Sequence, residues 1–123
     1  MGQILVVDDE SSIRELIKDV LSMEGHAVDT APNAVEGLAM LAKKRYDVVI
    51  MDRNMPKMTG IEAVKKMRAT PALKDQKVIM CTSAGMVSEV DEAFQAGAND
   101  YVMKPIDLAK LVQKAARFAP PPA

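Results

Sequence analysis

The chain alternates between two hydrophobic patterns along its length. Short apolar runs, typical of strands buried on both faces of a parallel sheet, alternate with segments whose apolar residues recur every three or four positions, as in amphipathic helices. Strands are predicted at residues 4–7, 47–51, 77–81 and 100–103, with a weaker one at 26–30. Each strand is followed by a helical pattern, and the last predicted helix covers residues 107–118.

Five strand–helix units in about 120 residues predict an α/β fold with a doubly wound, five-stranded parallel sheet and five helices. Right-handed crossovers between parallel strands leave few other topologies, and a chain of 123 residues fits one domain. We expect this domain to cover residues 1–119. Residues 120–123 should form a proline-rich tail, because proline cannot continue a helix.

Polar residues and glycines predict where several helices begin and end. Ser12 lies three residues before Glu15, and Asn33 lies three residues before Glu36. This spacing is close to that of a capping box at a helix N-terminus. Gly25 and Gly97 are placed where helices should end, since glycine tolerates the left-handed backbone of a helix C-terminus.

Composition and charge exclude several classes of protein. The chain has 16 basic and 17 acidic residues, a net charge of -1, and so has no overall field to attract nucleic acid or an anionic membrane. Cys81, the only cysteine, lies in an apolar run, which favours a buried, inert thiol in a reducing compartment. No basic leader or run of about 20 apolar residues is present. We therefore expect a soluble cytoplasmic protein with protein partners.

The chemistry-bearing residues follow the predicted strands. Asp8 and Asp9 end the first strand, Asp52 ends the third, Ser83 follows the fourth and Lys104 follows the fifth. In an open parallel sheet, functional groups gather outside the carboxyl ends of the strands. The sequence therefore predicts that these five residues meet at one edge of the sheet.

The carboxylates of this group predict a metal site. Two carboxylates roughly 4 Å apart repel by on the order of 4 kcal/mol at an effective dielectric of about 20, and a divalent cation removes that repulsion. Oxygen ligands without histidine or thiolate favour Mg²⁺. Each residue also has a purely structural interpretation, since acids favour helix N-termini and most lysines are solvated charges. Their convergence on one edge favours the metal site.

Four segments together resemble the CheY-like receiver domains of bacterial two-component response regulators. They are "VVDD" at 6–9, "VVIMDRNMPKMTG" at 48–60, "TSA" at 82–84 and "AGANDYVMKP" at 96–105. The resemblance covers essentially the whole chain in order and spacing. It implies a flavodoxin-like fold with strand order 2-1-3-4-5.

The resemblance also implies an acceptor and its metal ligands. Asp52 is similar to the aspartate that accepts a phosphoryl group from a histidine kinase or phosphotransfer protein. Asp9 and Asp52 resemble direct Mg²⁺ ligands, Asp8 resembles a ligand through water, and the backbone carbonyl of Asn54 resembles a further ligand. Mg²⁺ is the one cofactor that this implies.

Three further residues have roles that rest on the resemblance. Ser83 and Lys104 are similar to the residues that hold the phosphoryl oxygens. Tyr101 resembles an aromatic switch that turns inward when the hydroxyl of Ser83 moves toward the phosphoryl group. Lys104 and Pro105 resemble a lysine–proline pair whose peptide bond is usually cis.

The function implied is that of a stand-alone, single-domain response regulator. It should become phosphorylated on Asp52 in a Mg²⁺-dependent reaction and bind an effector protein at the face of the fourth helix, fifth strand and fifth helix. It should not be an enzyme beyond its own phosphorylation and dephosphorylation. Neither nucleic acid nor membrane is an expected partner.

Two other functions are alternatives. A Mg²⁺-dependent phosphohydrolase would use Asp52 as its nucleophile, but no segment is available for a cap and no second acid follows at a general-acid spacing. A receiver that works unphosphorylated as a scaffold would not need the acids, hydroxyl and lysine together. The phosphorylated receiver is therefore the leading hypothesis.

Four other residues lie near or outside this predicted site. His26, the only histidine, is expected at the surface because no metal-ligand spacing surrounds it. Met55, Met58 and Met86 are expected in loops beside the site. They could fill the core or, as flexible thioethers, form an adaptable docking surface, and the sequence does not choose.

Overall fold

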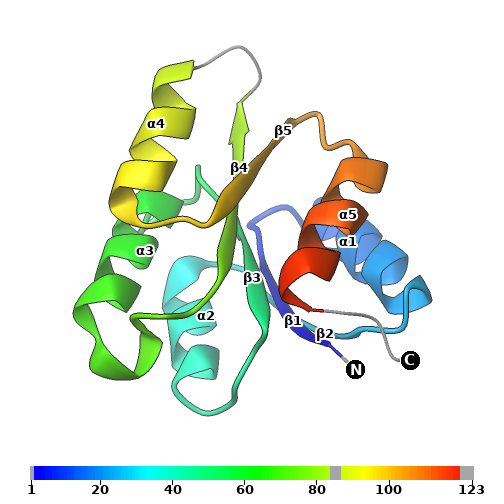
Figure 1. Ribbon diagram of the computed structural model, residues 1–123, viewed down its shortest axis with the longest axis horizontal. Helices are drawn as coiled ribbons and strands as arrows, with labels where there is room; N and C mark the ends of the chain where they lie inside the picture. The colour runs from blue at the N-terminus through cyan, green and yellow to red at the C-terminus, as the bar shows by residue number, and fades with distance from the viewer. Residues whose placement is uncertain (1, 84–86, 120–123) are drawn as a thin grey trace.

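Five parallel strands form the centre of the fold in a computed structural model that describes residues 2–83 and 87–119 (Figure 1). The strands are β1 (Gln3–Val7), β2 (Ala27–Ala31), β3 (Val48–Asp52), β4 (Val78–Ser83) and β5 (Asp100–Lys104). Their order in the sheet is β2-β1-β3-β4-β5, with every neighbouring pair parallel. The predicted doubly wound, flavodoxin-like sheet is confirmed. The proline-rich tail at 120–123 lies outside the described residues.

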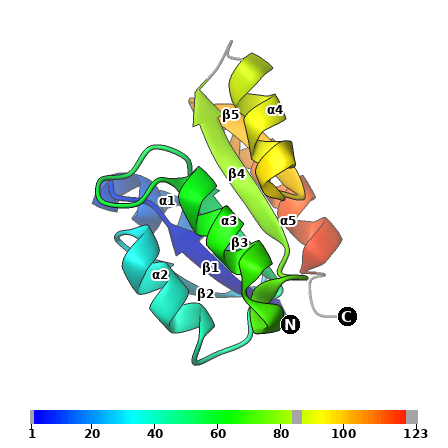
Figure 2. The ribbon, with the colours of Figure 1, turned by 90° about the vertical axis from the view of Figure 1, so that its left-hand side faces the viewer.

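Helices cover both faces of the sheet (Figures 1 and 2). They are α1 (Ser11–Met23), α2 (Ala34–Leu41), α3 (Gly60–Ala69), α4 (Val87–Ala96) and α5 (Leu108–Phe118), with a short 3₁₀ helix at Pro71–Leu73. Buried residues of α1 and α5 pack on one face, and those of α2, α3 and α4 pack on the other. Because all the strands are parallel, their carboxyl ends lie together at one edge of the sheet.

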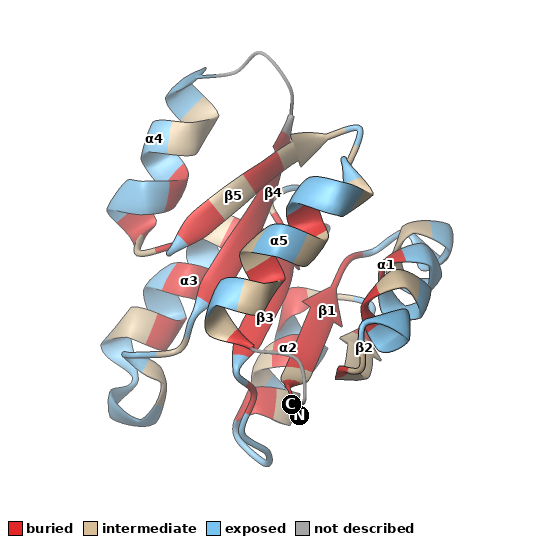
Figure 3. Cartoon of the chain, turned by 45° about the vertical axis from the view of Figure 1, so that its right-hand side comes forward, coloured by how far each residue is buried: buried red, intermediate tan, exposed pale blue. Residues whose placement is uncertain are grey.

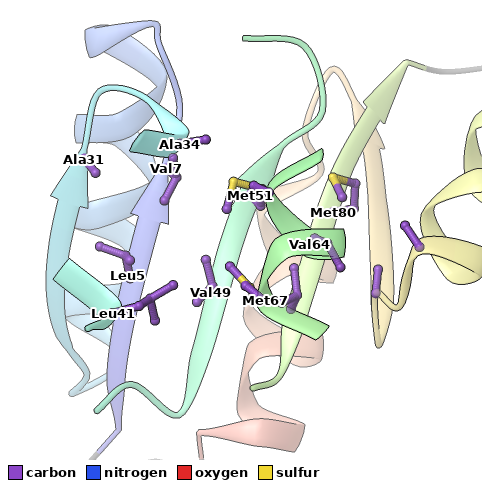
Figure 4. Packing of buried hydrophobic residues seen from close by; sticks show 14 of the residues in the cluster. Leu5, Val7, Ala31, Ala34, Leu41, Val49, Met51, Val64, Met67 and Met80 are labelled. Atoms are coloured by element: carbon purple, nitrogen blue, oxygen red, sulfur yellow. The ribbon is translucent and has the colours of Figure 1, made fainter. Parts of the chain in front are cut away.

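The inner strands alternate their side chains between the two hydrophobic layers. In β1, Leu5 and Val7 pack with the layer of α2 and α3, whereas Ile4 and Val6 pack with the layer of α1 and α5. This alternation follows from the pleat of a strand. Figure 3 shows the central strands buried along their length, and Figure 4 shows the layer that contains Leu5 and Met80. Burial on both faces explains the continuous apolar runs in the sequence.

The helix ends partly match the predicted signals. Asn33 accepts a hydrogen bond from the backbone nitrogen of Glu36 at 2.9 Å, so this N-cap is confirmed. The prediction for Ser12 is wrong, because Ser12 lies inside α1, two residues after the actual N-cap, Glu10, which makes no side-chain capping bond. The capping box of α3, between Thr59 and Glu62, was missed.

Both glycines predicted at helix ends have the left-handed backbone that a non-glycine side chain disfavours. Gly25, after α1, has φ of 92°, and Gly97, after α4, has φ of 117°. At Gly97 a Cβ would also lie 2.8 Å from Arg68 Cγ. Among the described helices, none combines the length and apolar character that a membrane span requires.

The structure tests the predictions for His26, Met55 and Met58. His26 is buried, with 6% of its surface exposed, so the prediction of a surface histidine is wrong. It lies beside Gly2 and Ala119, where the first and last described segments meet. Met55 is buried and Met58 packs against the same layer, which supports core filling for both. Met86 lies outside the described residues.

Cys81 was expected to be buried and inert, and it is buried with a free thiol. Burial, together with the nearby carboxylate of Asp52, raises the pKa of the Cys81 thiol to about 12. A thiol with this pKa stays protonated and unreactive at neutral pH.

Candidate functional site

The three predicted acids meet at the carboxyl edge of the sheet. Asp52 is the last residue of β3, and Asp8 and Asp9 directly follow β1, its neighbour in the sheet. Carboxylate oxygens of all three lie within 4.8 Å of one another. Asp8 and Asp52 are 1% and 2% exposed, whereas Asp9 is exposed to solvent. The site therefore combines two buried carboxylates with one accessible carboxylate.

Strand alternation explains why the two buried acids share a side of the sheet. Asp52 comes two residues after Ile50, which packs in the layer of α1 and α5. Asp8 comes two residues after Val6, which packs in the same layer. Because β1 and β3 are parallel with Val6 opposite Ile50, the two acids extend from matching positions.

Lys104, the last residue of β5, contacts both buried acids. Its Nζ atom lies 2.9 Å from Asp52 Oδ1 and 3.8 Å from Asp8 Oδ2. The following peptide bond, between Lys104 and Pro105, is cis, as the resemblance implied. The structure thus brings Lys104 and the predicted acids together from three different strands.

Burial dominates the electrostatics of the acids. It raises the pKa of Asp52 to about 6, even though Lys104 favours the charged form, and Asp8 adds to the rise. Burial also raises the pKa of Asp8, more than the hydrogen bond from the backbone nitrogen of Glu10 lowers it. For Lys104, burial alone would lower the pKa, but the two carboxylates together raise it above its usual value.

The acid cluster fits a hard divalent cation. Asp8 Oδ2 is buried and has no hydrogen-bond partner among the described residues, although Lys104 lies 3.8 Å away. A buried carboxylate oxygen without a partner is costly, and a cation bound by oxygen ligands would satisfy it. Asp9 supplies a solvent-accessible oxygen nearby. The residues present therefore fit Mg²⁺, and the carbonyl of Asn54 stays a predicted ligand.

The loop from Arg53 to Thr59 lies beside Asp52. The backbone nitrogen of Asn54 lies 3.4 Å from Asp52 Oδ1. A Cβ on Gly60, the first residue of α3, would lie 2.4 Å from the backbone oxygen of Asp52, so only glycine allows this approach. The sequence shows Gly60 eight residues after Asp52, but this spacing alone did not predict the close approach of the two residues.

Arg53 connects this loop to α4. Its Nη2 atom lies 2.9 Å from Glu92, and its Nε atom lies 3.7 Å from Glu89. These ion pairs join the residue after Asp52 to a helix of the predicted effector face. Nothing in the sequence pattern pairs residue 53 with residues 89 and 92.

Two neighbouring residues at the end of β4 carry a hydroxyl. Ser83 ends β4 and its backbone lies opposite Lys104, but its side chain lies outside the described part of the structure. Thr82, one residue earlier, is fully buried, and its Oγ1 has no hydrogen-bond partner among the described residues. The side chain of Thr82 lies on the same side of β4 as that of Met80, two residues earlier, and Met80 lies opposite Tyr101. Thr82 is therefore a second candidate hydroxyl, on the side of the sheet that Tyr101 shares.

Tyr101 lies between α4 and α5. Its ring packs edge-on against Phe94 of α4, with centroids 5.9 Å apart and planes at 89°. The Nζ atom of Lys114 of α5 lies 4.4 Å from the ring centroid. A pocket of about 220 Å³ lies beside the ring, lined mainly by β5 and α5. The predicted switch residue is thus in contact with both helices of the predicted effector face.

A second pocket, which borders Lys104, lies between α1 and the segment after β5. Its volume is about 250 Å³, and its lining is mostly apolar. The lining residues are Glu10, Ile13, Leu16, Ile17, Lys104, Pro105, Ile106 and Leu108. Lys104 therefore contacts the acids and also borders an apolar groove at the surface.

Comparison with known proteins identifies the family. Residues 4–116 match the response regulator receiver domain, so the chain belongs to this family. A chemotaxis protein CheY homolog of Campylobacter jejuni is 42% identical over 114 residues, covering 91% of this chain and 88% of that protein. Response regulator MprA of a Mycobacterium species is 37% identical, but the match covers 48% of MprA.

Solved structures give the same result. The chemotaxis protein CheY4 of Vibrio cholerae superposes with a TM-score of 0.89 at 36% identity, covering 96% of this chain and 98% of that one. The chain is a CheY-like receiver of a response regulator, a family that works in phosphorylation-based two-component signalling. Histidine kinases and effector proteins are the partners of this family in general.

Proposed function

We propose that Asp52 accepts a phosphoryl group from the phosphohistidine of a histidine kinase or phosphotransfer protein, and that the phosphorylated chain binds an effector protein. The observation that carries this proposal is the contact of Lys104 Nζ with Asp52 Oδ1 at 2.9 Å, beside the carboxylates of Asp8 and Asp9. This arrangement places a fixed cation and further oxygen ligands around one buried carboxylate.

The chain's own residues provide most of the chemistry of transfer. The contacts of Lys104 and of the Asn54 amide fall on Asp52 Oδ1, which leaves Oδ2 to attack phosphorus. A new O–P bond forms as the N–P bond of the donor breaks, and the electron pair of that bond returns to the histidine ring, which takes up a proton. The ammonium group of Lys104, which pairs with Asp52 in the resting protein, then holds a phosphoryl oxygen.

The acids bind the cofactor of this reaction. When bound, Mg²⁺ supplies positive charge that offsets the repulsion between the attacking carboxylate and the phosphoryl oxygens. Asp8, Asp9 and Asp52 would hold it, with the carbonyl of Asn54 as a further ligand. The unpartnered Oδ2 of Asp8 supports this assignment.

Two surfaces suit the two kinds of partner. The apolar groove between α1 and the segment after β5 borders Lys104, so helices of a phosphodonor could dock there and present their histidine to Asp52. The surface of α4, β5 and α5 contains Tyr101 and the pocket beside it, and it would bind the effector. Phosphorylation should tighten effector binding by about 1–3 kcal/mol, the usual scale of allosteric coupling.

The chain is proposed to act as a switch rather than as an enzyme with separate substrates. Asp52 is 2% exposed, which suits a donor delivered by a docked protein or a very small phosphate donor. The small net charge of -1 favours protein partners over nucleic acid or membrane. A free buried thiol at Cys81 suits the reducing cytoplasm.

Beryllofluoride, which mimics a phosphoryl group on an aspartate, tests the proposal in solution. With Mg²⁺ and beryllofluoride, amide resonances should shift around Asp52 and also along α4, β5 and α5, and without Mg²⁺ neither set should shift. Shifts confined to the acid site would refute the transmission of a signal. An absence of shifts at Asp52 would refute the acceptor assignment.

A further inference from the structure

Lys114 has three contacts that converge on one stretch of β5. Its Nζ atom lies 2.9 Å from Asp100 Oδ1, donates a hydrogen bond to the backbone oxygen of Tyr101, and lies 4.4 Å from the centroid of the Tyr101 ring. A cation within about 6 Å of a ring centroid is attracted to the ring face. Lys114 therefore binds both the backbone and the side chain of the predicted switch residue.

The ring is held from two helices. Phe94 of α4 contacts it in an edge-to-face geometry, which is the favoured arrangement of an aromatic pair. Lys114 of α5 supplies the cation. If the ring turns toward Thr82, it must give up its present contact with the ammonium. The present position of the ring is therefore stabilised by a contact that a turned ring would lose.

The ion pair with Asp100 alone does not account for this placement of Lys114. Arg117, one turn later on α5, also pairs with Asp100, at 3.4 Å from Oδ2. Arg117 is mostly exposed, and the structure shows no contact between its described side chain and the Tyr101 ring. The two cations thus share one acid, and the ring contact distinguishes them.

We propose that Lys114 is a positioning residue that holds the Tyr101 ring in its resting place. Lys114 thereby sets the fraction of unphosphorylated molecules in which the ring has already turned. The inference rests on the proposed function, because it concerns the switch of the same site. Removing the ammonium should raise the turned population by about two- to fivefold, the factor that a surface cation–π contact supplies. The effector surface would then be partly active without phosphorylation.

The test uses the complete chain labelled with 3-fluorotyrosine. The protein contains two tyrosines, Tyr46 and Tyr101, so its ¹⁹F spectrum has two lines, which Tyr101→Phe assigns. Lys114→Met and Arg117→Met each remove one positive charge and one ion pair with Asp100, but only the first removes the ring contact and the hydrogen bond to the Tyr101 backbone oxygen. Lys114→Arg restores a cation that can stack on an aromatic ring.

Without phosphate, the Tyr101 line of Lys114→Met should move toward the position that it takes in the wild type with Mg²⁺ and beryllofluoride. The line should stay at its resting position in Arg117→Met and in Lys114→Arg. A Lys114→Met line at the resting position, or an equal movement in Arg117→Met, would overturn the inference while leaving the proposed function in place. If beryllofluoride shifts the Asp52 amide resonance but leaves the wild-type Tyr101 line unchanged, the tyrosine switch and the inference are both overturned.

Discussion

Lys104 Nζ lies 2.9 Å from Oδ1 of Asp52, and this contact joins the last residues of β3 and β5. The strand between them, β4, ends with the candidate hydroxyls Thr82 and Ser83. The carboxylate is nevertheless difficult to ionise, because its burial outweighs the favourable charge of the lysine. In the resting site, Asp52 is desolvated and is repelled by Asp8, and a bound cation would offset both costs.

This electrostatic state predicts how stability depends on pH in the metal-free protein. The pKa of Asp52 is about 6 in the fold against 3.8 in the unfolded chain, so the folded state binds more protons between these values. The free energy of unfolding should therefore fall as pH rises from about 4 to about 7, by on the order of 2 kcal/mol from Asp52 alone. Burial of Asp8 acts in the same direction.

Urea unfolding in EDTA at several pH values measures this effect. Because other groups also titrate, the decisive quantity is the stability of Asp52→Asn minus that of the wild type. This difference should grow as pH rises from 4 to 7. A difference that stays constant over this range would contradict the raised pKa. The control is Asp47→Asn. The carboxylate of Asp47 lies on another part of the surface and accepts a hydrogen bond from the backbone nitrogen of Gln3.

Mg²⁺ should stabilise the protein, since a ligand of the native state raises its melting temperature. The stabilisation should shrink strongly in Asp8→Asn and Asp9→Asn. In EDTA, Asp8→Asn should be more stable than Asp9→Asn, because Asp8 is buried with an unpartnered oxygen whereas Asp9 is exposed. Thermal unfolding followed by circular dichroism tests both points, and unchanged Mg²⁺ stabilisation in both variants would contradict the metal site.

Thr82 and Ser83 can be separated by mutation. Thr82→Val keeps the shape of the side chain and removes a buried hydroxyl without a partner, so the resting protein should gain about 1 kcal/mol of stability. If Thr82 is the hydroxyl that follows the phosphoryl group, the same change should abolish the beryllofluoride shifts of Tyr101, and Ser83→Ala should preserve them. The opposite pattern in the NMR spectra would assign the role to Ser83.

Gly60 should be indispensable for the geometry of the chain at Asp52. A Cβ there would lie 2.4 Å from the backbone oxygen of Asp52, whereas a Cβ on Gly37 would lie 2.9 Å from a methyl group of Val7. Because backbone yields less readily than a side chain, Gly60→Ala should cost about 3 kcal/mol of stability and Gly37→Ala about 1 kcal/mol. Denaturant unfolding tests the ranking, and equal costs would contradict it.

The sequence predicted the sheet and the meeting of the charged residues for the same physical reason. Strands buried on both faces require continuous apolar runs, and parallel strands place their carboxyl ends at one edge. Asp8, Asp52 and Lys104 directly follow or end such runs, so their neighbourhood could be predicted before any distance was known.

Features that depend on tertiary packing could not be predicted in this way. His26 is buried beside Gly2 and Ala119, residues far apart in the sequence, and its sequence context has no pattern that marks it. Ser12 has the spacing of a cap, but the N-cap of α1 is Glu10, two residues earlier. The choice between Thr82 and Ser83 depends on which face of β4 each side chain occupies, and neighbouring hydroxyls in a sequence do not reveal it.

The central claim is that Asp52 is the phosphoryl acceptor. Intact-mass spectrometry after incubation with acetyl phosphate and Mg²⁺ tests it most directly, with Asp52→Asn beside Asp100→Asn, which changes another buried aspartate paired with a lysine. The wild type and Asp100→Asn should gain the mass of one phosphoryl group, and Asp52→Asn should gain none. Labelling of Asp52→Asn at the wild-type rate would contradict the account.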